Sequence, residues 1–199
     1  MEIILGGVII VSLIIFLALF LFSIVIFAVH HKTGGAMFVP TPKVMVKMII
    51  DSVDFSRFED IRELGSGDGR FMAAVEKRYG RKVRGYEVNP IAYLVCRCKI
   101  VLFRLGSSVV YRSFWTEDLR DADCTFCYLF PDIMPRLGMK LGRELKEGAL
   151  VISANFPVPG WRPAEVLRCT HSIFNDPVYL YRIGSHLGEP AMTGEKYKE

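Results

Sequence analysis

The chain has 199 residues, of which 51% are hydrophobic and 23% are charged, and its formal net charge is +4. This composition excludes a disordered chain, which lacks the apolar residues that a core needs, and five cysteines in this length argue against a small disulfide-stapled domain. The length predicts one domain with at most a small appendage, and the weak, dispersed positive charge does not indicate nucleic-acid binding.

The first predicted element is an apolar segment from Ile3 to Val29 that contains no charged residue. As a helix it would be roughly 40 Å long, against a hydrocarbon core of about 30 Å. Its start is acidic, at Glu2, and it is longer than the apolar part of a signal peptide. We therefore expect residues 1–31 to form an uncleaved single-pass anchor in the lipid bilayer. Because Lys32 follows it, the positive-inside rule places the rest of the chain on the cytoplasmic side. The absence of an arginine-rich leader favours a bacterial inner membrane over a mitochondrial one.

Residues 32–60 are predicted to be a linker and one helix. Thr33-Gly34-Gly35 indicates a hinge, and Val39-Pro40-Thr41-Pro42 indicates a turn that cannot be helical. Thr41 suits an N-cap with a proline at the first helical position. The helix itself is predicted from Lys43 to Val53.

Strands and helices alternate from residue 61 to residue 184, which predicts an α/β domain with a parallel sheet covered on both faces. The predicted strands are Ile61–Gly65, Val83–Val88, Val109–Phe114, Cys124–Phe130 and Ala149–Phe156, and the predicted helices are Arg70–Tyr79, Pro90–Arg104 and Met134–Lys146. Gly80 and Gly148 are expected to be left-handed C-caps. Two last strands, Glu165–Ile173 and Val178–Ile183, leave no room for a helix between them and predict an antiparallel hairpin at one edge of the sheet. Residues 185–199 are predicted to be a polar tail.

A glycine-rich turn, Gly65-Ser66-Gly67-Asp68-Gly69, joins the first of these strands to a helix. Glycines let the backbone turn tightly and approach a ligand without a Cβ in the way. Glu87 follows about 20 residues later, where an acidic residue meets ribose hydroxyls in nucleotide-binding βαβ units. The G-x-G-x-G spacing is not that of dinucleotide sites. The carboxylates of Glu63 and Asp68 would repel a pyrophosphate but would suit cationic ammonium and sulfonium groups.

With these motifs, the chain resembles the class I S-adenosylmethionine-dependent methyltransferases. The resemblance implies S-adenosylmethionine as cofactor and the strand order 3-2-1-4-5-7-6 with strand seven antiparallel. The fold expected for the whole chain is a single transmembrane helix followed by a compact Rossmann-like methyltransferase domain of seven strands. The residues implied in cofactor binding are Thr41, Glu63, Gly65, Ser66, Gly67, Asp68, Gly69, Glu87, Asn89 and Trp115.

A closer resemblance is to the membrane-anchored protein-lysine methyltransferases that include the ATP synthase c-subunit and adenine nucleotide translocase lysine methyltransferases. It covers most of the chain and rests on Phe38–Pro42, Glu63–Arg70, Glu87–Pro90, Phe114-Trp115 and Gly148–Trp161, which occur in this order. It implies that the substrate is a lysine of a membrane or membrane-proximal protein. Two departures are Glu63, where an aspartate is more usual, and Ser113, where an acidic residue is common and bears on the adenine contact.

Three residues outside the glycine turn are candidates for a role in binding or orienting the substrate. Asp132 follows the fourth predicted strand, at the edge where open α/β sheets bind ligands, and either orients the acceptor amine or caps the next helix. Trp115, next to Glu117 and Asp118, either stacks on adenine or substrate or packs in the core. Trp161 either forms part of the wall of the substrate entrance or contacts lipid headgroups. His171 and His186 are assigned no role.

The paired cysteines, Cys96 with Cys98 and Cys124 with Cys127, are interpreted as buried or half-buried thiols of a reducing compartment, and no metal site is expected. The predicted function is methyl transfer to a lysine of a membrane protein. A small-molecule or lipid methyltransferase and a cofactor-binding membrane scaffold without activity are the alternatives.

Overall fold

The computed structural model describes residues 7, 10–17, 19–21, 39–168 and 176–185. The chain divides into two compact units, Met1–Phe38 and Val39–Glu199. The described residues of the first unit are helical. Within the described ranges, no helix is both long enough and apolar enough to cross a membrane. The predicted anchor, Ile3 to Val29, lies in large part outside these ranges.

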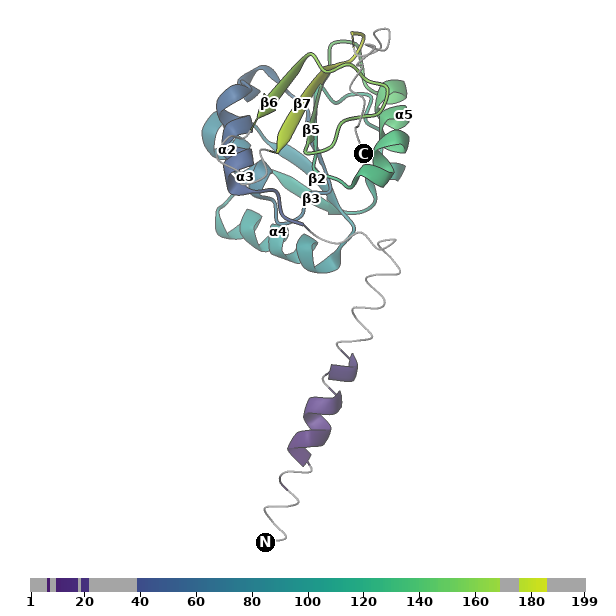
Figure 1. Cartoon of the computed structure of the whole chain (residues 1–199). Helices are drawn as coiled ribbons and strands as arrows, with labels where there is room; N and C mark the ends of the chain where they lie inside the picture. Colours follow the sequence, from purple (N-terminus) through teal and green to yellow (C-terminus); the bar gives the residue numbers. More distant parts are fainter. Residues whose placement is uncertain (1–6, 8–9, 18, 22–38, 169–175, 186–199) are drawn as a thin grey trace. The chain divides into compact units, whose positions relative to one another are not determined.

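A seven-stranded sheet forms the centre of the second unit, in the order β3-β2-β1-β4-β5-β7-β6 (Figure 1). The strands are β1 Ile61–Leu64, β2 Val83–Glu87, β3 Ser108–Tyr111, β4 Cys124–Cys127, β5 Leu150–Ala154, β6 Glu165–Arg168 and β7 Pro177–Arg182. The first five strands pair in parallel, whereas β7 is antiparallel to both β5 and β6. The predicted strand order and the antiparallel terminal strands are thus confirmed. The predicted continuation of β6 to Ile173 lies outside the described residues.

Helices cover both faces of this sheet (Figure 1). They are α2 Lys43–Ser52, α3 Arg70–Tyr79, α4 Pro90–Leu102 and α5 Met134–Glu144, with short 3₁₀ turns η1 Phe55–Arg57, η2 Phe114–Thr116 and η3 Pro131–Ile133. Buried side chains of α2, α3 and α4 form one core cluster with the sheet, and those of α5 form a second cluster. Helix α2, which the sequence predicts from Lys43 to Val53 ahead of the first strand, belongs to the first cluster, since Met45 and Ile49 are fully buried.

Several predicted element ends are wrong for local backbone reasons. Helix α4 stops at Leu102 because Arg104 has a φ of 52°, outside the helical region. Helix α5 stops at Glu144 because Leu145 is extended. The N-cap position of α2 is Pro42 rather than Thr41, and no side chain caps this helix.

The two predicted glycine caps have different outcomes. Gly80 follows α3 with a φ of 67° and its N–H bonds the carbonyl of Glu76, as expected for a left-handed C-cap. Gly148 also has a positive φ, 80°, but it lies in the turn that leads into β5 and does not cap α5.

Of the four cysteines that the structure describes, three are buried. Cys96, Cys124 and Cys127 are buried, as predicted, whereas Cys98 is exposed on α4. The prediction for Cys98 is wrong because its face of the helix is turned away from the sheet. Among the described residues, no group of three His, Cys, Asp or Glu side chains could hold a metal ion.

Candidate active site

The loop between β1 and α3 lies at the carboxyl edge of the sheet, and its geometry requires glycine. Gly65, Gly67 and Gly69 have φ values of 78°, 54° and 73°, in the left-handed region that side chains disfavour. The backbone N–H groups of Gly65 and Ser66 both donate to the carbonyl of Tyr86 at the end of β2, at 3.0 and 2.9 Å. The loop is therefore held against β2 in one conformation.

A Cβ would collide with a neighbour at two of these glycines. At Gly65 it would lie 2.9 Å from Leu129 Cδ2, in the segment that follows β4. At Gly69 it would lie 2.5 Å from the Cys96 sulfur, so this glycine allows α3 to begin close against α4. Gly65 therefore allows Leu129, in the segment after β4, to pack closely against the loop, while Gly69 serves the packing of two helices.

Glu87, at the end of β2, binds the loop with both carboxylate oxygens. Its Oε2 accepts a hydrogen bond from Gly67 N at 2.7 Å. Its Oε1 accepts from Val88 N at 2.9 Å and from Asn89 N at 2.7 Å. The side chain is 8% exposed. The residue predicted to meet ribose hydroxyls thus also braces the glycine loop, and its oxygens have a fixed position before any ligand arrives.

Glu63, in β1, carries a buried carboxylate that is not fully satisfied. Its side chain is 3% exposed, and Oε2 has no hydrogen-bond partner among the described residues. Burial raises the pKa of this carboxyl well above its usual value, and the negative charges of Asp68 and Glu87 raise it further. A backbone hydrogen bond from Met72 lowers the pKa but does not offset the burial. A buried oxygen without a donor is costly, and the ammonium group of S-adenosylmethionine would supply a cationic donor. The residues present therefore fit the cofactor that the sequence implies.

Asp68 has its charge neutralised within the protein. Its carboxylate pairs with Arg70 at 2.9 Å and with Lys99 of α4 at 2.6 Å. Burial raises the pKa of Asp68, but the hydrogen bonds and charges of Arg70 and Lys99 outweigh this and lower it to about 2. Sequence reasoning assigned Asp68 to the cofactor and missed Lys99. In the structure, this carboxylate joins the loop to α4.

Three further predicted cofactor residues, Thr41, Ser66 and Asn89, form hydrogen bonds within the segments around the glycine loop. Thr41 is buried, and its carbonyl accepts from Arg70 Nη1 at 2.6 Å. Ser66 is buried, with its hydroxyl 3.3 Å from the carbonyl of Tyr86. Asn89 is the N-cap of α4, and its Oδ1 accepts from the next two free backbone N–H groups. Direct contact of these three residues with the cofactor stays a prediction.

Trp115, in η2 after β3, has a cation over its ring. The guanidinium carbon of Arg136, from α5, lies 4.2 Å from the ring centroid of Trp115. Ser113 is the N-cap of η2, with its hydroxyl accepting from Trp115 N at 3.4 Å. Sequence reasoning did not identify Arg136. The adenine contact of Trp115 stays a prediction.

The remaining candidates differ in what surrounds them. Asp132 is exposed in the first turn of η3, and neither η3 nor α5 has a side-chain cap hydrogen bond. Asp118 forms an exposed ion pair with Arg120, and Glu117 forms one with Arg112. These two acidic residues are thus both paired with arginines.

Trp161 packs into the second core cluster. Its ring lies edge-on to that of Tyr181, at 5.5 Å between centroids, and its indole passes close to Gly138 of α5. This contact favours a packing role within the domain over the headgroup contact considered from the sequence.

Two residues at the same edge were missed by sequence reasoning. Tyr128 directly follows β4 and is partly buried. Asn155 directly follows β5 and has a φ of 69°, which is uncommon for a residue with a side chain. Their only sequence signal is their position immediately after predicted strands. Like Asp132, both residues follow strands at the carboxyl edge of the sheet.

The raised pKa of Glu63 predicts a pH dependence of cofactor binding. A cationic ligand favours the ionised carboxylate, so binding must release the proton that burial retains on Glu63. Affinity for S-adenosylmethionine is therefore expected to increase by up to about tenfold per pH unit below the pKa of Glu63. The raised pKa of Glu63 has the opposite effect on the stability of the free protein. The stability that protonated Glu63 contributes is present at low pH and is lost as the pH rises through the pKa of Glu63 in the folded state.

Calorimetric titrations between about pH 5 and pH 7 would measure this dependence, below the range in which the ligand's own amino group titrates. Glu63→Gln is the matched variant, because it removes the titrating group and keeps the shape. A flat affinity profile in the unmodified protein would contradict the assignment of Glu63 to the cofactor's cation.

A comparison with protein families identifies the domain. The family model described as the ANTKMT methyltransferase domain matches residues 63–165, from Glu63 through β5 to the start of β6. The match therefore includes the glycine loop, Glu87 and the segments that follow β3, β4 and β5.

Curated relatives agree with this match. A protein-lysine N-methyltransferase of Saccharolobus islandicus (strain REY15A) is 32% identical over 152 residues, which cover 75% of this chain and 94% of the relative. The adenine nucleotide translocase lysine N-methyltransferase of Mus musculus is 38% identical over 109 residues, covering 53% of this chain. The ATP synthase c-subunit lysine N-methyltransferase of the same species is 34% identical over 164 residues, covering 80% of this chain. The matches span 47% and 63% of the two mouse proteins.

Solved structures give the same fold. An RNA methyltransferase from Salinibacter ruber, in complex with S-adenosyl-L-homocysteine, superimposes with a TM-score of 0.65 at 25% identity, over 81% of this chain and 100% of that one. A ribosomal protein L11 methylase from Lactobacillus delbrueckii superimposes with a TM-score of 0.58 at 13% identity, over 70% of this chain and 77% of that one, which supports the fold alone. By the family match and the near-complete coverage of the archaeal relative, the chain belongs to the ANTKMT methyltransferase domain family.

Proposed function

We propose that this protein uses S-adenosylmethionine to methylate the ε-amino group of lysine side chains in proteins. The observation that carries the cofactor assignment is the buried Glu63 Oε2, which has no donor among the described residues and lies beside a glycine loop braced by Glu87. The choice of lysine rests on the names of the three relatives above, each a lysine methyltransferase.

Methyl transfer requires little covalent chemistry from the protein. When bound, S-adenosylmethionine supplies a methyl group on a sulfonium; the carbon–sulfur bond breaks as the carbon–nitrogen bond forms, and the sulfur keeps the electron pair. The residues of the chain must align the acceptor nitrogen with that methyl group. They must also favour the neutral amine, because a lysine of unperturbed pKa about 10.4 carries a proton that blocks attack. A carboxylate near the entering amine can hold and orient it as that proton leaves.

Asp132 is the residue that we assign to this orienting role. It is exposed after β4, on the carboxyl side of the sheet, and no side-chain hydrogen bond to a helix end uses it. Asp132→Asn is expected to lower the turnover number about 100-fold, while the affinity for S-adenosylmethionine stays unchanged. Turnover with labelled cofactor and calorimetric binding measure the two quantities separately.

Asp121→Asn is the matched control, because Asp121 is equally exposed but precedes β4 at the opposite edge of the sheet. It should change neither quantity. Unchanged turnover in Asp132→Asn would mean that Asp132 does not orient the acceptor amine.

We further propose that residues 3–29 anchor the protein in a membrane, with the domain on the cytoplasmic side of a bacterial inner membrane, and that the acceptor is a membrane or membrane-proximal protein. The support for the anchor is its apolar sequence and the exposure of the described apolar side chains from Ile10 to Leu21. The support for the substrate is the names of two relatives, which refer to an adenine nucleotide translocase and to the ATP synthase c-subunit. Tethering would raise the concentration of the domain near such a target.

The test is to incubate cell membranes with the purified protein and with cofactor labelled in the methyl group, and then to separate protein, lipid and nucleic acid. We expect the label in the protein fraction. Label found only in lipid would favour the lipid methyltransferase alternative, and label found only in RNA would point to the activity named for the Salinibacter structure. Either result would overturn the proposal.

A further inference from the structure

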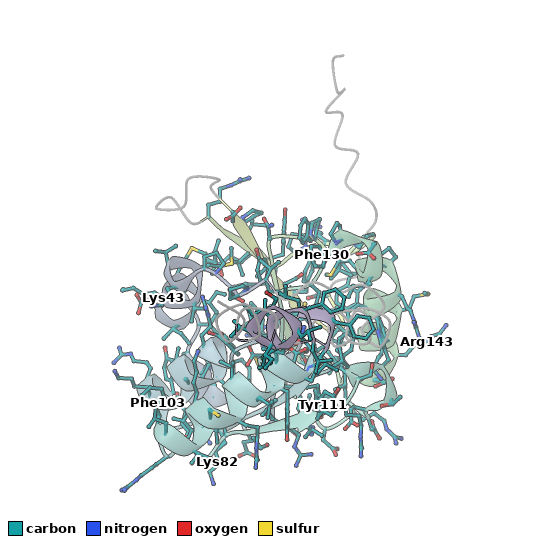
Figure 2. The ribbon with its side chains drawn as sticks, turned by 90° about the horizontal axis from the view of Figure 1, so that it is seen from below. Lys43, Lys82, Phe103, Tyr111, Phe130 and Arg143 are labelled. Carbon is teal, nitrogen blue, oxygen red and sulfur yellow. The ribbon has the colours of Figure 1, made fainter. Side chains whose placement is uncertain are left out.

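Helix α4 exposes an apolar face that is not covered by the described part of the chain. Six large apolar residues on or directly after α4 are between 42% and 74% exposed: Ile91, Leu94, Val95, Val101, Leu102 and Phe103. The opposite side of the helix is buried against the sheet through Ala92, Cys96 and Ile100. Figure 2 looks onto this helix, with Phe103 and Tyr111 toward its two ends. Exposed apolar patches of this size mark interaction surfaces.

The charged residues of α4 and of the segment after it are all basic, and one of them, Lys99, pairs with Asp68. Between Glu87 and Glu117 the chain contains no acidic residue, whereas it contains Arg97, Lys99, Arg104 and Arg112. Arg97 and Arg104 are exposed beside the apolar residues. An apolar face bordered by arginines and aromatic rings is the pattern of a helix that lies in a bilayer interface with anionic lipids. A second copy of the chain would bring the same positive charges together.

The start of the domain is linked to α4 through a series of polar contacts. The carbonyl of Thr41 accepts a hydrogen bond from Arg70, Arg70 pairs with Asp68, and Asp68 pairs with Lys99 of α4. Only residues 30–38 separate the proposed anchor from Val39, a stretch that spans roughly 35 Å at most. This limit on the distance between the proposed anchor and Val39 is compatible with α4 lying at the membrane surface.

From these observations we infer that the exposed face of α4 (Ile91, Leu94, Val95, Val101, Leu102 and Phe103) lies in the headgroup region of a membrane that contains anionic lipids. This contact adds an orientation to the proposed anchor. Helix α4 begins three residues after Glu87, so its N-terminal end brings the cofactor edge of the sheet near the membrane plane. A lysine that projects from a membrane protein just above the bilayer would then be within reach of the site.

Cys98, in the middle of this face, allows the contact to be measured on the full chain. It is exposed, whereas Cys96, Cys124 and Cys127 are buried, and burial raises the pKa of the Cys96 and Cys127 thiols to about 12. With Cys169→Ser in place, a fluorescent maleimide is directed to Cys98. The labelled protein is reconstituted into vesicles of phosphatidylcholine and phosphatidylglycerol that carry a spin-labelled lipid quencher near the headgroups.

We expect several-fold stronger quenching at Cys98 than at a control probe on α5, introduced as Arg143→Cys with Cys98→Ser. Arg143 is exposed on the other side of the sheet (Figure 2). Quenching at Cys98 should decrease in vesicles of phosphatidylcholine alone and in the Leu94→Gln, Leu102→Gln variant. Binding of S-adenosylhomocysteine in each variant confirms that the domain is folded.

A third probe, Ser12→Cys, reports on the anchor separately. Quenching of the probe at position 12 by a lipid spin-labelled in the bilayer interior, without quenching at Cys98, would overturn the α4 contact and would still support the anchor. Quenching at Cys98 alone would support α4 and refute the anchor. If the probe at Cys98 is shielded from the quencher and Cys98 of the unlabelled protein forms disulfide-linked dimers under oxidising conditions, the face contacts a second copy and our inference is wrong.

Discussion

Replacing Gly65 by valine is expected to lower the affinity for S-adenosylmethionine at least about 100-fold. The φ of 78° at this residue is strained for any side chain and most of all for a β-branched one. The new Cβ would also lie 2.9 Å from Leu129 Cδ2, so either the loop or the Leu129 side chain must move. Both movements displace groups at the edge where the cofactor is expected to bind. Calorimetric titration with S-adenosylmethionine measures the loss.

Gly148→Val separates loss of the site from loss of stability. Gly148 has almost the same φ, 80°, and a Cβ added there would meet no atom within 4 Å beyond its chain neighbours. It precedes β5, at the opposite edge of the sheet from the glycine loop. This variant should show a similar backbone strain and normal cofactor affinity. Equal affinities in the two variants would mean that the cofactor does not approach Gly65.

Replacing Glu87 by glutamine is expected to weaken cofactor binding about 10- to 100-fold. A glutamine offers one acceptor oxygen where Glu87 uses two, so the backbone N–H of Gly67 or those of Val88 and Asn89 would face an amide NH₂ group. A buried donor left without a partner costs about 1–3 kcal/mol, and the glycine loop loses its brace as well. Binding affinity and thermal unfolding should be measured on the same sample.

Glu76→Gln is the corresponding change outside the site. Glu76 accepts from Gly106 N with one oxygen and from Ser107 N with the other, at 2.6 and 2.9 Å, next to the start of β3. Its loss should lower stability by an amount similar to the loss at Glu87, without changing cofactor affinity. A cofactor affinity that falls equally in both variants would assign Glu87 a purely structural role.

The sheet could be predicted because its order follows from local patterns. Short apolar runs alternate with helical runs, and the absence of a helix between the last two runs gave the antiparallel edge that β7 forms with β5. The glycine loop and Glu87 could be predicted for the same reason, since turn chemistry and spacing are both properties of a short stretch of chain.

The contacts that organise the site could not be predicted in this way. Lys99 meets Asp68 from 31 residues away, and Arg70 meets the carbonyl of Thr41 from 29 residues away. The guanidinium of Arg136, in α5, lies over the ring of Trp115, in η2. These pairs depend on how separate elements pack against each other, and periodicity and motif spacing do not predict that packing.

Helix α4 shows a second limit. Its residues are apolar on both sides, so the sequence identifies a helix but not which side meets the sheet. The pattern therefore led to the expectation of a covered Cys98, whereas the structure exposes it together with Leu94 and Leu102. Only the position of the sheet distinguishes the core face of α4 from the face that we assign to the membrane.

The central claim is that the protein methylates lysine, and amino-acid analysis tests it most directly. Membranes from cells that lack the gene are incubated with the full chain and with S-adenosylmethionine labelled in the methyl group, and the protein fraction is then hydrolysed in acid. The label should elute with methylated lysine standards, should be absent with Gly65→Val, and should be retained with Gly148→Val. Label that elutes with methylated arginine or histidine, or no label in the protein fraction, would contradict the claim.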